Sequence, residues 1–370
     1  MLITKKSELA PALGLVGSIV ERRNTIPILS NLAIERTNGG LRARMTDLDI
    51  EAEIEFAGAL DTSFKPFTVP ANLLRDIISK LPESGDIQFH AGDDSDTPGT
   101  IYIKCGRSKF TLQSPPVADL ATMNLGTLSN RITISSKQLL AAIGAVSFAI
   151  STEETRYYLN GIFMHATETG MMFVATDGHR LAKRLVPIEN AHLVAGGVII
   201  PRKTIAALTK VLPKDGDILI EWNENKIVFS LPSTKILSKL IDGQFPDYQR
   251  VIPQSNSTEV TINGKQLAAA VERVQLISTE RGRAMRFRFE ESGLTLTVNN
   301  PDAGAAEEQL AFEGQADFET GFNAKYVLDA INHLAEDEIR MALDEPNSPA
   351  ILRADGDHVE NLIVLMPMRV

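Results

Sequence analysis

The chain has 370 residues, which favours two or three domains, and its 44% hydrophobic and 23% charged content is that of a folded protein. A net charge of −10, taken as an average, argues against nucleic-acid binding, although an acidic protein can still carry one basic face. The single cysteine, Cys105, excludes an intramolecular disulfide. No apolar run approaches the roughly 18 residues of a membrane span, and the first residues lack a signal peptide's apolar segment, so we expect a soluble cytoplasmic protein.

In chain order, the first predicted elements are a short strand at 2–4 and a helix that begins near Ser7. Ser7 is a candidate N-cap, and Pro11 is acceptable if it lies in the first turn. The same strand and helix return twice. The apolar stripes of the three helices are Leu9, Leu13, Val16 and Val20; then, 130 positions on, Leu139, Ile143, Val146 and Ile150; then, a further 128 on, Leu267, Val271 and Val274. This agreement in spacing indicates three copies of one unit.

A second helix is predicted in the later part of each copy. In the first two copies a proline stands at the start of this helix, where it is tolerated. Another proline follows the last apolar residue and ends the helix. Its apolar residues are Leu74, Ile77 and Leu81; Ile205, Leu208 and Leu212; and Val327, Ala330 and Leu334. Between the helices, apolar and polar residues alternate as in strands, for example in 286–289.

These elements predict an α+β protein. Each copy should hold two helices and about eight strands, in an order that repeats within the copy as a half-unit of roughly 60 residues. Short connections such as 38–40 favour antiparallel sheets with helices on one face. The polar, turn-rich stretches near 126–130 and 254–258 place the domains at 1–127, 128–255 and 256–370.

A strand–turn–strand unit marks the same place in each copy. The turns lie at Asp47, Asp177 and Asp302, separated by 130 and 125 positions. Asp177-Gly178 is a two-residue hairpin signal, and only this middle turn continues as Gly-His-Arg. Whatever these residues do should therefore happen once per chain.

Five motifs stand in order along the whole chain: 23–32 (RNTIPILSNL), 156–161 (RYYLNG), 175–182 (ATDGHRLA), 242–248 (DGQFPDY) and 366–369 (MPMR). Together they resemble the bacterial replicative sliding clamps, the β subunits of DNA polymerase III. The resemblance implies a non-enzymatic processivity factor without a cofactor. Its three clamp domains would close as a head-to-tail homodimeric ring, helices inside and sheets outside, around duplex DNA.

Cations on the inward helices would then contact phosphates without reading bases, so that binding is independent of sequence. Taken one by one, the same lysines are better explained as ordinary solvated helix faces, and only the ring that the resemblance implies favours DNA contact for the whole set. Asn72 stands where some relatives carry a basic residue, and Arg75 is a candidate to replace it. Tyr157 and Tyr158 could touch DNA near the rim or form a buried pair. The predicted DNA-binding residues are Arg23, Arg75, Lys137, Tyr157, Tyr158, Arg202, Lys203 and Lys210, with Lys265, Arg273 and Lys325 on further helices.

The resemblance also implies a dimer seam and a peptide-binding pocket. Seam residues would be Lys109, Phe110 and Leu112 on one side and Leu276 and Ile277 on the other, unless the last two belong to the third domain's core. The pocket would hold short peptides of the polymerase III catalytic subunit, clamp-loader subunits, other polymerases and repair proteins. The alternative is that Met366, Pro367 and Met368 only pack the C-terminal strand into the third domain's core. Aliphatic and methionine side chains suit such a site, and Gly178 would let the backbone approach a ligand closely. Its predicted residues are Leu159, Thr176, Gly178, His179, Arg180, Leu181, Pro246, Arg250, Val251, Val364, Met366, Pro367, Met368 and Arg369.

The alternative is a hydrolase that uses Asp177 and His179 as an acid–base pair and Arg180 as an anion clamp. The sequence lacks a phosphate-binding glycine loop and a G-x-S-x-G elbow, and its six histidines show no metal-ligand spacing. An isolated Asp-Gly-His is most often a turn whose aspartate bonds the local backbone. We therefore expect no catalytic residue and no metal site.

Overall fold

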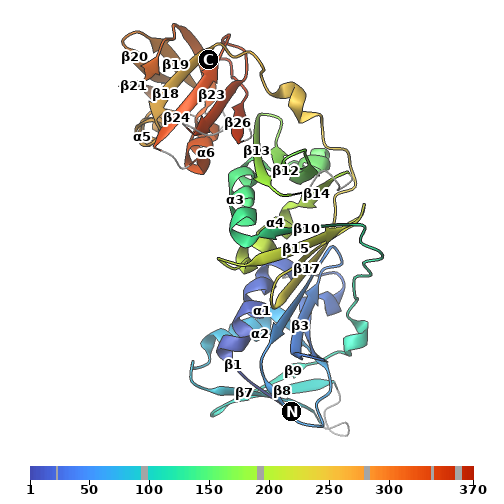
Figure 1. Ribbon diagram of the computed structural model, residues 1–370. Coiled ribbons are helices and arrows are strands. Elements are labelled where there is room, and N and C mark those ends of the chain that lie inside the picture. The colour runs from blue at the N-terminus through green and yellow to red at the C-terminus, as the bar shows by residue number, and fades with distance from the viewer. Residues whose placement is uncertain (22–23, 93–98, 190–195, 279–283, 335–336, 355–360) are drawn as a thin grey trace. The chain divides into compact units, whose positions relative to one another are not determined.

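The computed structural model describes the chain except for residues 22–23, 93–98, 190–195, 279–283, 335–336 and 355–360 (Figure 1). It divides into two compact units, one made of residues 1–140 and 200–241 and the other of 141–199 and 242–370. The division passes through the middle of the second copy. Each unit therefore contains one whole copy and half of the second, as expected if a copy is built from two similar halves.

Among its described residues, the first unit contains three complete helices and two sheets. The helices are α1 (Lys6–Ile19), α2 (Ala71–Lys80) and α4 (Arg202–Val211), and α1 packs against both others. One sheet has the order β5 (Ala59–Leu60), β1 (Leu2–Lys5), β7 (Asp86–Ala91), β8 (Thr100–Cys105), β9 (Ser108–Gln113). The other has the order β10 (Asn130–Ser135), β15 (Asp217–Trp222), β16 (Lys226–Ser230), β17 (Thr234–Lys239), β4 (Ile50–Phe56), β3 (Gly40–Thr46), β2 (Asn31–Thr37), β6 (Phe67–Pro70).

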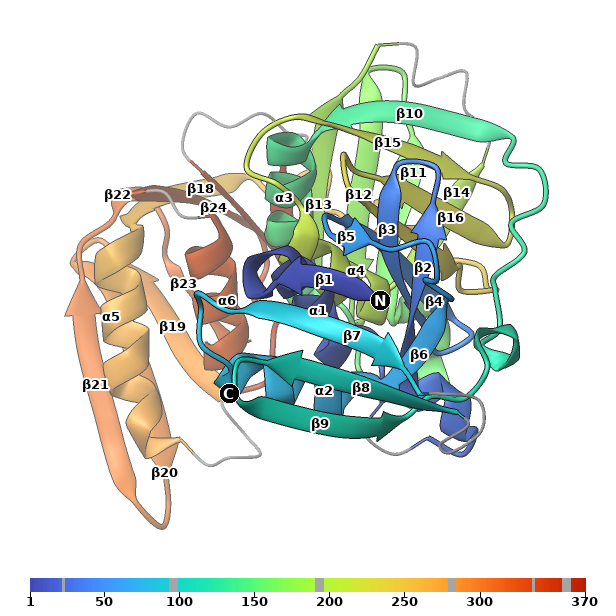
Figure 2. The same cartoon turned by 90° about the horizontal axis from the view of Figure 1, so that it is seen from below.

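The second unit repeats this plan with α5 (Gly264–Val274), which packs on β20 and β21 (Figure 2), and α6 (Ala324–Leu334). Its larger sheet has the order β14 (Gly197–Pro201), β11 (Gly161–Ala166), β12 (Gly170–Thr176), β13 (Arg180–Pro187), β26 (Leu362–Leu365), β25 (Ala350–Ala354), β24 (Glu338–Leu343), β18 (Thr258–Asn263), β22 (Glu313–Gly314). Its smaller sheet has the order β21 (Gly304–Leu310), β20 (Gly293–Asn300), β19 (Ala284–Glu290), β23 (Phe318–Asn323). Helix α3 (Ser136–Val146) contains the boundary between the units.

The predicted helices and antiparallel strands are confirmed, with one correction at the first helix. Helix α1 begins at Lys6, its N-cap is Lys5, and no side chain caps it, so the N-cap prediction for Ser7 is wrong. Pro11 then lies inside the helix rather than in its first turn, where it leaves the carbonyl of Ser7 without its usual N–H partner. The stripe Leu9, Leu13 and Val16 is buried as predicted, and this burial outweighs the missing bond.

Two sheets run continuously from one copy into the next. At the first junction β4 pairs with β17, with Glu51 opposite Leu237. At the second junction β13 pairs with β26, with Leu181 opposite Val364. The domain boundaries that we propose, 127/128 and 255/256, fall in the connections between β9 and β10 and between β17 and β18. Among the described residues no helix combines the length and apolar character needed to cross a membrane.

Candidate functional site

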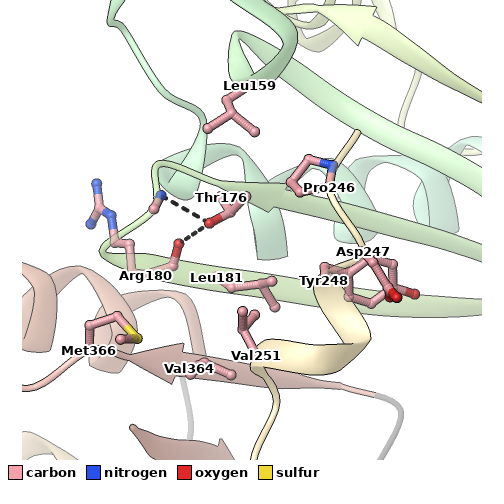
Figure 3. Close-up of a pocket in the computed structure, with 11 residues that line it drawn as sticks. Leu159, Thr176, Arg180, Leu181, Pro246, Asp247, Tyr248, Val251, Val364 and Met366 are labelled. Atoms are coloured by element: carbon pink, nitrogen blue, oxygen red, sulfur yellow. Dashed lines mark hydrogen bonds between the residues drawn. The ribbon is translucent and has the colours of Figure 1, made fainter. Parts of the chain in front are cut away.

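The turn between β12 and β13 is fixed by its own side chains. Asp177 Oδ1 accepts from the backbone N–H groups of His179 at 2.9 Å and Arg180 at 3.0 Å, and Asp177 Oδ2 accepts from Arg180 Nε at 3.0 Å. Thr176 Oγ1 donates to the carbonyl of Arg180 and accepts from the N–H of Gly178 (Figure 3). The hairpin turn is confirmed. The carboxylate is committed to holding this turn and to Arg180, which leaves the proposed acid–base pair without a basis.

Gly178 has a positive φ of 87°, which favours glycine, and it lines the cavity described below, while the side of its Cα where a side chain would stand is occupied by Arg156. A Cβ at this position would lie 2.6 Å from Nη1 of Arg156. That arginine is held over the turn by Glu153, to which its Nε donates at 2.8 Å. The glycine therefore accommodates the guanidinium of Arg156.

A cavity of about 240 Å³ opens at the second junction (Figure 3). Its walls come from the end of the 3-10 segment Glu154–Leu159, from the turn and β13, from the connection that contains the 3-10 turn Tyr248–Val251, and from β26 and the residue that follows it. Most of the lining is apolar. It consists of Leu159, Thr176, Gly178, Arg180, Leu181, Pro246, Asp247, Tyr248, Val251, Val364 and Met366. Nine residues of the predicted pocket are thus brought together from positions as far apart as 159 and 366.

Five predicted pocket residues do not line this cavity: His179, Arg250, Pro367, Met368 and Arg369. The His179 carbonyl accepts from the N–H of Met366, and its ring stacks on Tyr326. The side chain of Arg250 is 84% exposed and pairs with Asp247. The N–H of Met368 donates to the carbonyl of Gly321, so the end of the chain follows β23.

Two lining residues, Asp247 and Tyr248, were not predicted from the sequence. The Tyr248 hydroxyl lies 2.9 Å from Nε2 of His165, whose Nδ1 lies 2.9 Å from the carbonyl of Ala166. Burial lowers the pKa of His165 and raises that of Tyr248, so both are neutral near pH 7. A neutral His165 that donates from Nδ1 can accept a hydrogen bond from the Tyr248 hydroxyl at Nε2, which fixes this wall of the cavity. The sequence did contain a signal for Tyr248, because an aromatic residue in an otherwise polar connection, between Pro246 and Val251, indicates a buried contact.

The predicted DNA contacts on the described α-helices are all Arg or Lys, and several are paired with acids. Arg75 Nη2 lies 3.1 Å from Asp76, and Lys203 contacts Asp47 and lies 3.7 Å from Glu21. The others on helices are exposed: Lys137 on α3, Arg202 and Lys210 on α4, and Lys325 on α6, together with Lys265 and Arg273 on α5, which pair with Asp337 and Glu308. Arg23 lies outside the described residues.

Tyr157 is 54% exposed and meets Tyr158 edge to face at 5.8 Å between ring centroids, so the alternative of a buried tyrosine pair is wrong for Tyr157. Of the predicted seam residues, Leu276 is 80% exposed, so it is not part of the third domain's core. Ile277 and Phe110 are half-buried, Lys109 is exposed and Leu112 is buried. Across the described ranges, no three His, Cys, Asp or Glu side chains are placed to hold a metal ion.

Three family models, for the N-terminal, central and C-terminal domains of the DNA polymerase III beta subunit, match residues 1–124, 133–247 and 249–369. The beta sliding clamp of Caulobacter vibrioides is 39% identical over 100% of both chains, and that of Pseudomonas aeruginosa is 34% identical over 99% of both. A crystal structure of a Bartonella birtlesii sliding clamp bound to griselimycin aligns with a TM-score of 0.94 at 42% identity, covering 100% of this chain and 99% of the other.

The repeated fold defines the class as a three-domain clamp of mixed helix and sheet. The chain belongs to the DNA polymerase III beta subunit family, the sliding clamps of DNA replication. It is a processivity factor and not an enzyme, and the hydrolase alternative has no support.

Proposed function

We propose that two copies of this chain close head to tail into a ring around duplex DNA and hold a polymerase there through the pocket at the second junction. The observation that carries the proposal is a pair of sheet edges. In the two junctions the last strand of a copy, β17 or β26, pairs with β4 or β13 of the copy before it. By the order of the sheets, β9 is the matching strand of the first copy and β21 that of the third.

Both β9 and β21 lie at the edge of their sheets. Exposed sheet edges favour pairing with another chain. A junction of the same kind between β21 of one chain and β9 of a second chain would pair both edge strands. Two chains joined by two such junctions make a closed ring of six domains, since each chain supplies one edge of each kind. Opposite charges support the same pairing: Arg107 and Lys109 flank the start of β9, and Glu307 lies exposed on β21.

Apolar side chains beside these edges would form the core of the seam. Leu276 and Ile277 lie in a 3-10 turn (Gln275–Ile277) that contacts β20 and β21, and Phe110 and Leu112 lie on β9. An 80% exposed leucine next to an open sheet edge is typical of an interface, since permanent contacts are more apolar than the rest of the surface.

Cations on the helices would contact the DNA backbone inside the ring. Arg202 and Lys210 on α4 and Lys137 on α3 are exposed, and the acids beside Arg75 and Lys203 weaken each contact. Weak phosphate contacts suit a ring that slides and is retained by its topology. Because bacterial DNA lies in the cytoplasm, the proposal also implies a cytoplasmic protein.

The pocket suits a short peptide with one or two apolar anchors, because its lining is apolar with few polar groups. The candidate partners are the polymerase III catalytic subunit, clamp-loader subunits, other polymerases and repair proteins. Griselimycin is bound to the similar clamps of Bartonella birtlesii and Pseudomonas aeruginosa, and we propose that it binds here at this pocket.

Retention on DNA tests the ring. After loading onto nicked circular duplex, the protein should stay bound through a high-salt wash and be lost once the circle is linearised. The double variant Leu276→Ala, Ile277→Ala should sediment as a folded monomer and fail to be retained. Equal retention on circular and linear DNA would refute encirclement, and an unchanged dimer would remove these two residues from the seam.

Griselimycin binding tests the pocket. Val251 is 49% exposed on the wall of the cavity, and Val370 is 48% exposed but does not line it. Val251→Asp should weaken griselimycin binding by at least tenfold in calorimetry, since a carboxylate replaces an apolar anchor contact. Val370→Asp makes the same chemical change and should leave binding unaltered. Equal effects of the two variants would exclude this cavity as the binding site.

A further inference from the structure

Arg180 lines the cavity, but each of the three nitrogens of its guanidinium donates a hydrogen bond elsewhere. Nε donates to Asp177 at 3.0 Å, Nη1 to Asp329 at 2.6 Å, and Nη2 to the carbonyl of Phe148 at 2.6 Å. The side chain is 8% exposed. Such charge-assisted bonds in a place with little water are among the stronger ones in proteins. The guanidinium is therefore fixed in one position.

That position lies to one side of the cavity. In Figure 3 the Arg180 guanidinium points away from Leu181 and Val251. Two rings hold it there: its central carbon lies 4.4 Å from the ring centroid of Tyr326 and 5.1 Å from that of Phe148. Cation–π contacts of this kind add to the hydrogen bonds.

The groups that hold Arg180 come from both sides of the second junction. Phe148 and Asp177 belong to the second copy, whereas Tyr326 and Asp329 lie on α6 of the third. The cavity is divided in the same way, with Leu181 on β13 and Val364 on β26. A bond from β13 to α6 therefore ties together the two parts of the chain that form the cavity.

We propose that Asp329, which does not line the cavity, is a positioning residue that sets its affinity for apolar ligands. It holds the Arg180 guanidinium outside the cavity and ties α6 to the turn before β13. This inference rests on the proposed function of the cavity as a ligand pocket. Arg180 itself then acts as a structural clasp and does not hydrogen-bond the ligand.

Removal of the Asp329 carboxylate would leave Nη1 of Arg180 without its acceptor in a poorly hydrated place. A buried unpaired donor on a cation is unfavourable, so the guanidinium would turn toward water. The cavity that Arg180 already lines is open to solvent and lies beside it. A guanidinium in its mouth would compete with an apolar ligand, and the loosened tie to α6 would leave Val364 and Met366 less well placed opposite Leu181.

The test uses the full-length protein and griselimycin as the probe, with dissociation constants from calorimetry at a temperature well below unfolding. Asp329→Ala should bind griselimycin roughly tenfold more weakly, the effect of losing one charge-assisted hydrogen bond. Asp329→Glu, which keeps the carboxylate, should recover part of this loss. Asp337→Ala is the matched control, because Asp337 pairs with Lys265 and does not line the cavity. It should leave the affinity unchanged.

A second pair of variants separates positioning from general stability. In an Arg180→Met background, Asp329→Ala should have no further effect on griselimycin affinity, because there is no guanidinium left to hold. Unchanged affinity of Asp329→Ala, or full additivity of the two substitutions, would overturn the inference. If the unmodified protein fails to bind griselimycin, or binds it equally after Val251→Asp, the proposed pocket itself is wrong.

Discussion

The two junctions between copies are built on one frame, yet the first is filled by the chain itself and the second is open. Corresponding residues of the first and second copies are 130 positions apart, and those of β17 and β26 are 127 apart. In both, a turn aspartate accepts from two backbone N–H groups, and the strand of the next copy donates to the carbonyl two residues after that aspartate. In the first junction Asp47 accepts from the N–H groups of Asp49 and Ile50, and the N–H of Lys239 donates to the carbonyl of Asp49. In the second junction Asp177 accepts from the N–H groups of His179 and Arg180, and the N–H of Met366 donates to the carbonyl of His179.

The difference lies in the connections that pass over each junction. In the first, the N–H of Leu120 donates to the carbonyl of Val117; 130 positions later, the N–H of Arg250 donates to that of Asp247. Leu120 is 2% exposed and packs with Leu29 and Ala33. The side chain of Arg250 is 84% exposed. Leu120 therefore points into the first junction, whereas Arg250 at the corresponding position points into solvent.

Charged groups complete the closure of the first junction. Arg44 Nη1 donates to the carbonyl of Ala121 at 2.7 Å, and Glu51 accepts from the N–H of Met123 at 3.0 Å. Leu181 stands at the place of Glu51 in the second junction, where it lines the cavity. The comparison teaches that the frame alone does not make a pocket. A pocket remains where the connection directs its side chain away from the junction, as at Arg250, and not into it, as at Leu120.

The largest effect should come from Arg44→Ala. It removes the clamp on the connection and leaves Glu51, which is fully buried, without its nearest cation. Breaking a buried charge network of this kind should lower the free energy of unfolding by about 3–5 kcal/mol, measured by urea denaturation. Arg42→Ala is the control, because Arg42 binds Glu35 and Glu53 in a more exposed place. An equal loss in both variants would mean that the connection is not held by Arg44.

Leu120→Ala should destabilise the protein by about 3 kcal/mol, since it removes a buried side chain and leaves a cavity against Leu29 and Ala33. The same truncation at the corresponding position, Arg250→Ala, should change the unfolding free energy by no more than about 0.5 kcal/mol, because an exposed ion pair contributes little. Urea unfolding of both variants measures the contrast directly. Comparable losses would contradict the assignment of Leu120 as the side chain that fills the first junction.

Arg250→Leu copies the first connection into the second. If the leucine turns inward as Leu120 does, it should fill part of the cavity and weaken griselimycin binding severalfold, by about 1 kcal/mol. The control is Arg250→Gln, which removes the charge without supplying an apolar plug and should bind griselimycin as the unmodified protein does. Unaltered binding by Arg250→Leu would show that the plug needs the anchors at Arg44 and Glu51.

The smallest effect is a pH dependence at the first junction. Burial raises the pKa of Glu51 above its ordinary value of 4.5, so the folded state holds this proton more tightly than the unfolded state. The contribution of Glu51 to stability is therefore full below about pH 4.5 and declines as the pH rises through the raised pKa. Glu51→Gln lacks this decline. Its melting temperature relative to the unmodified protein should rise between pH 4.5 and pH 8, and a constant difference would contradict the prediction.

Much of the fold follows from local patterns in the sequence. Helical spacing in Leu9, Leu13 and Val16 and its returns marked the repeat, and Asp177-Gly178 marked the turn, because both depend on neighbours within a few residues. The same locality explains an error: Ser7 looks like an N-cap, but the helix begins at Lys6 directly from β1, whose pairing with β7 sets the start.

Only the tertiary structure decided which parts meet at each junction. Leu159, Leu181 and Val364 are far apart in sequence, and no local pattern states that β26 lies beside β13. For the same reason the sequence did not indicate the roles of Tyr248, which was not predicted to line the pocket, and of Arg180, which was predicted to line it. Tyr248 forms part of the cavity wall because it is held by His165, and the guanidinium of Arg180 is held away from the cavity by Asp329.

The sequence by itself determined that there are three similar copies, since periodic burial requires only a consistent spacing of apolar residues. Whether a junction is closed or open was decided by single side chains acting across long loops. Leu120 and Arg250 occupy equivalent turns, and which of them enters the space beneath depends on partners such as Arg44 and Glu51 that lie some 70 positions away in the chain. Packing and charge pairing at that distance exist only once the chain has folded.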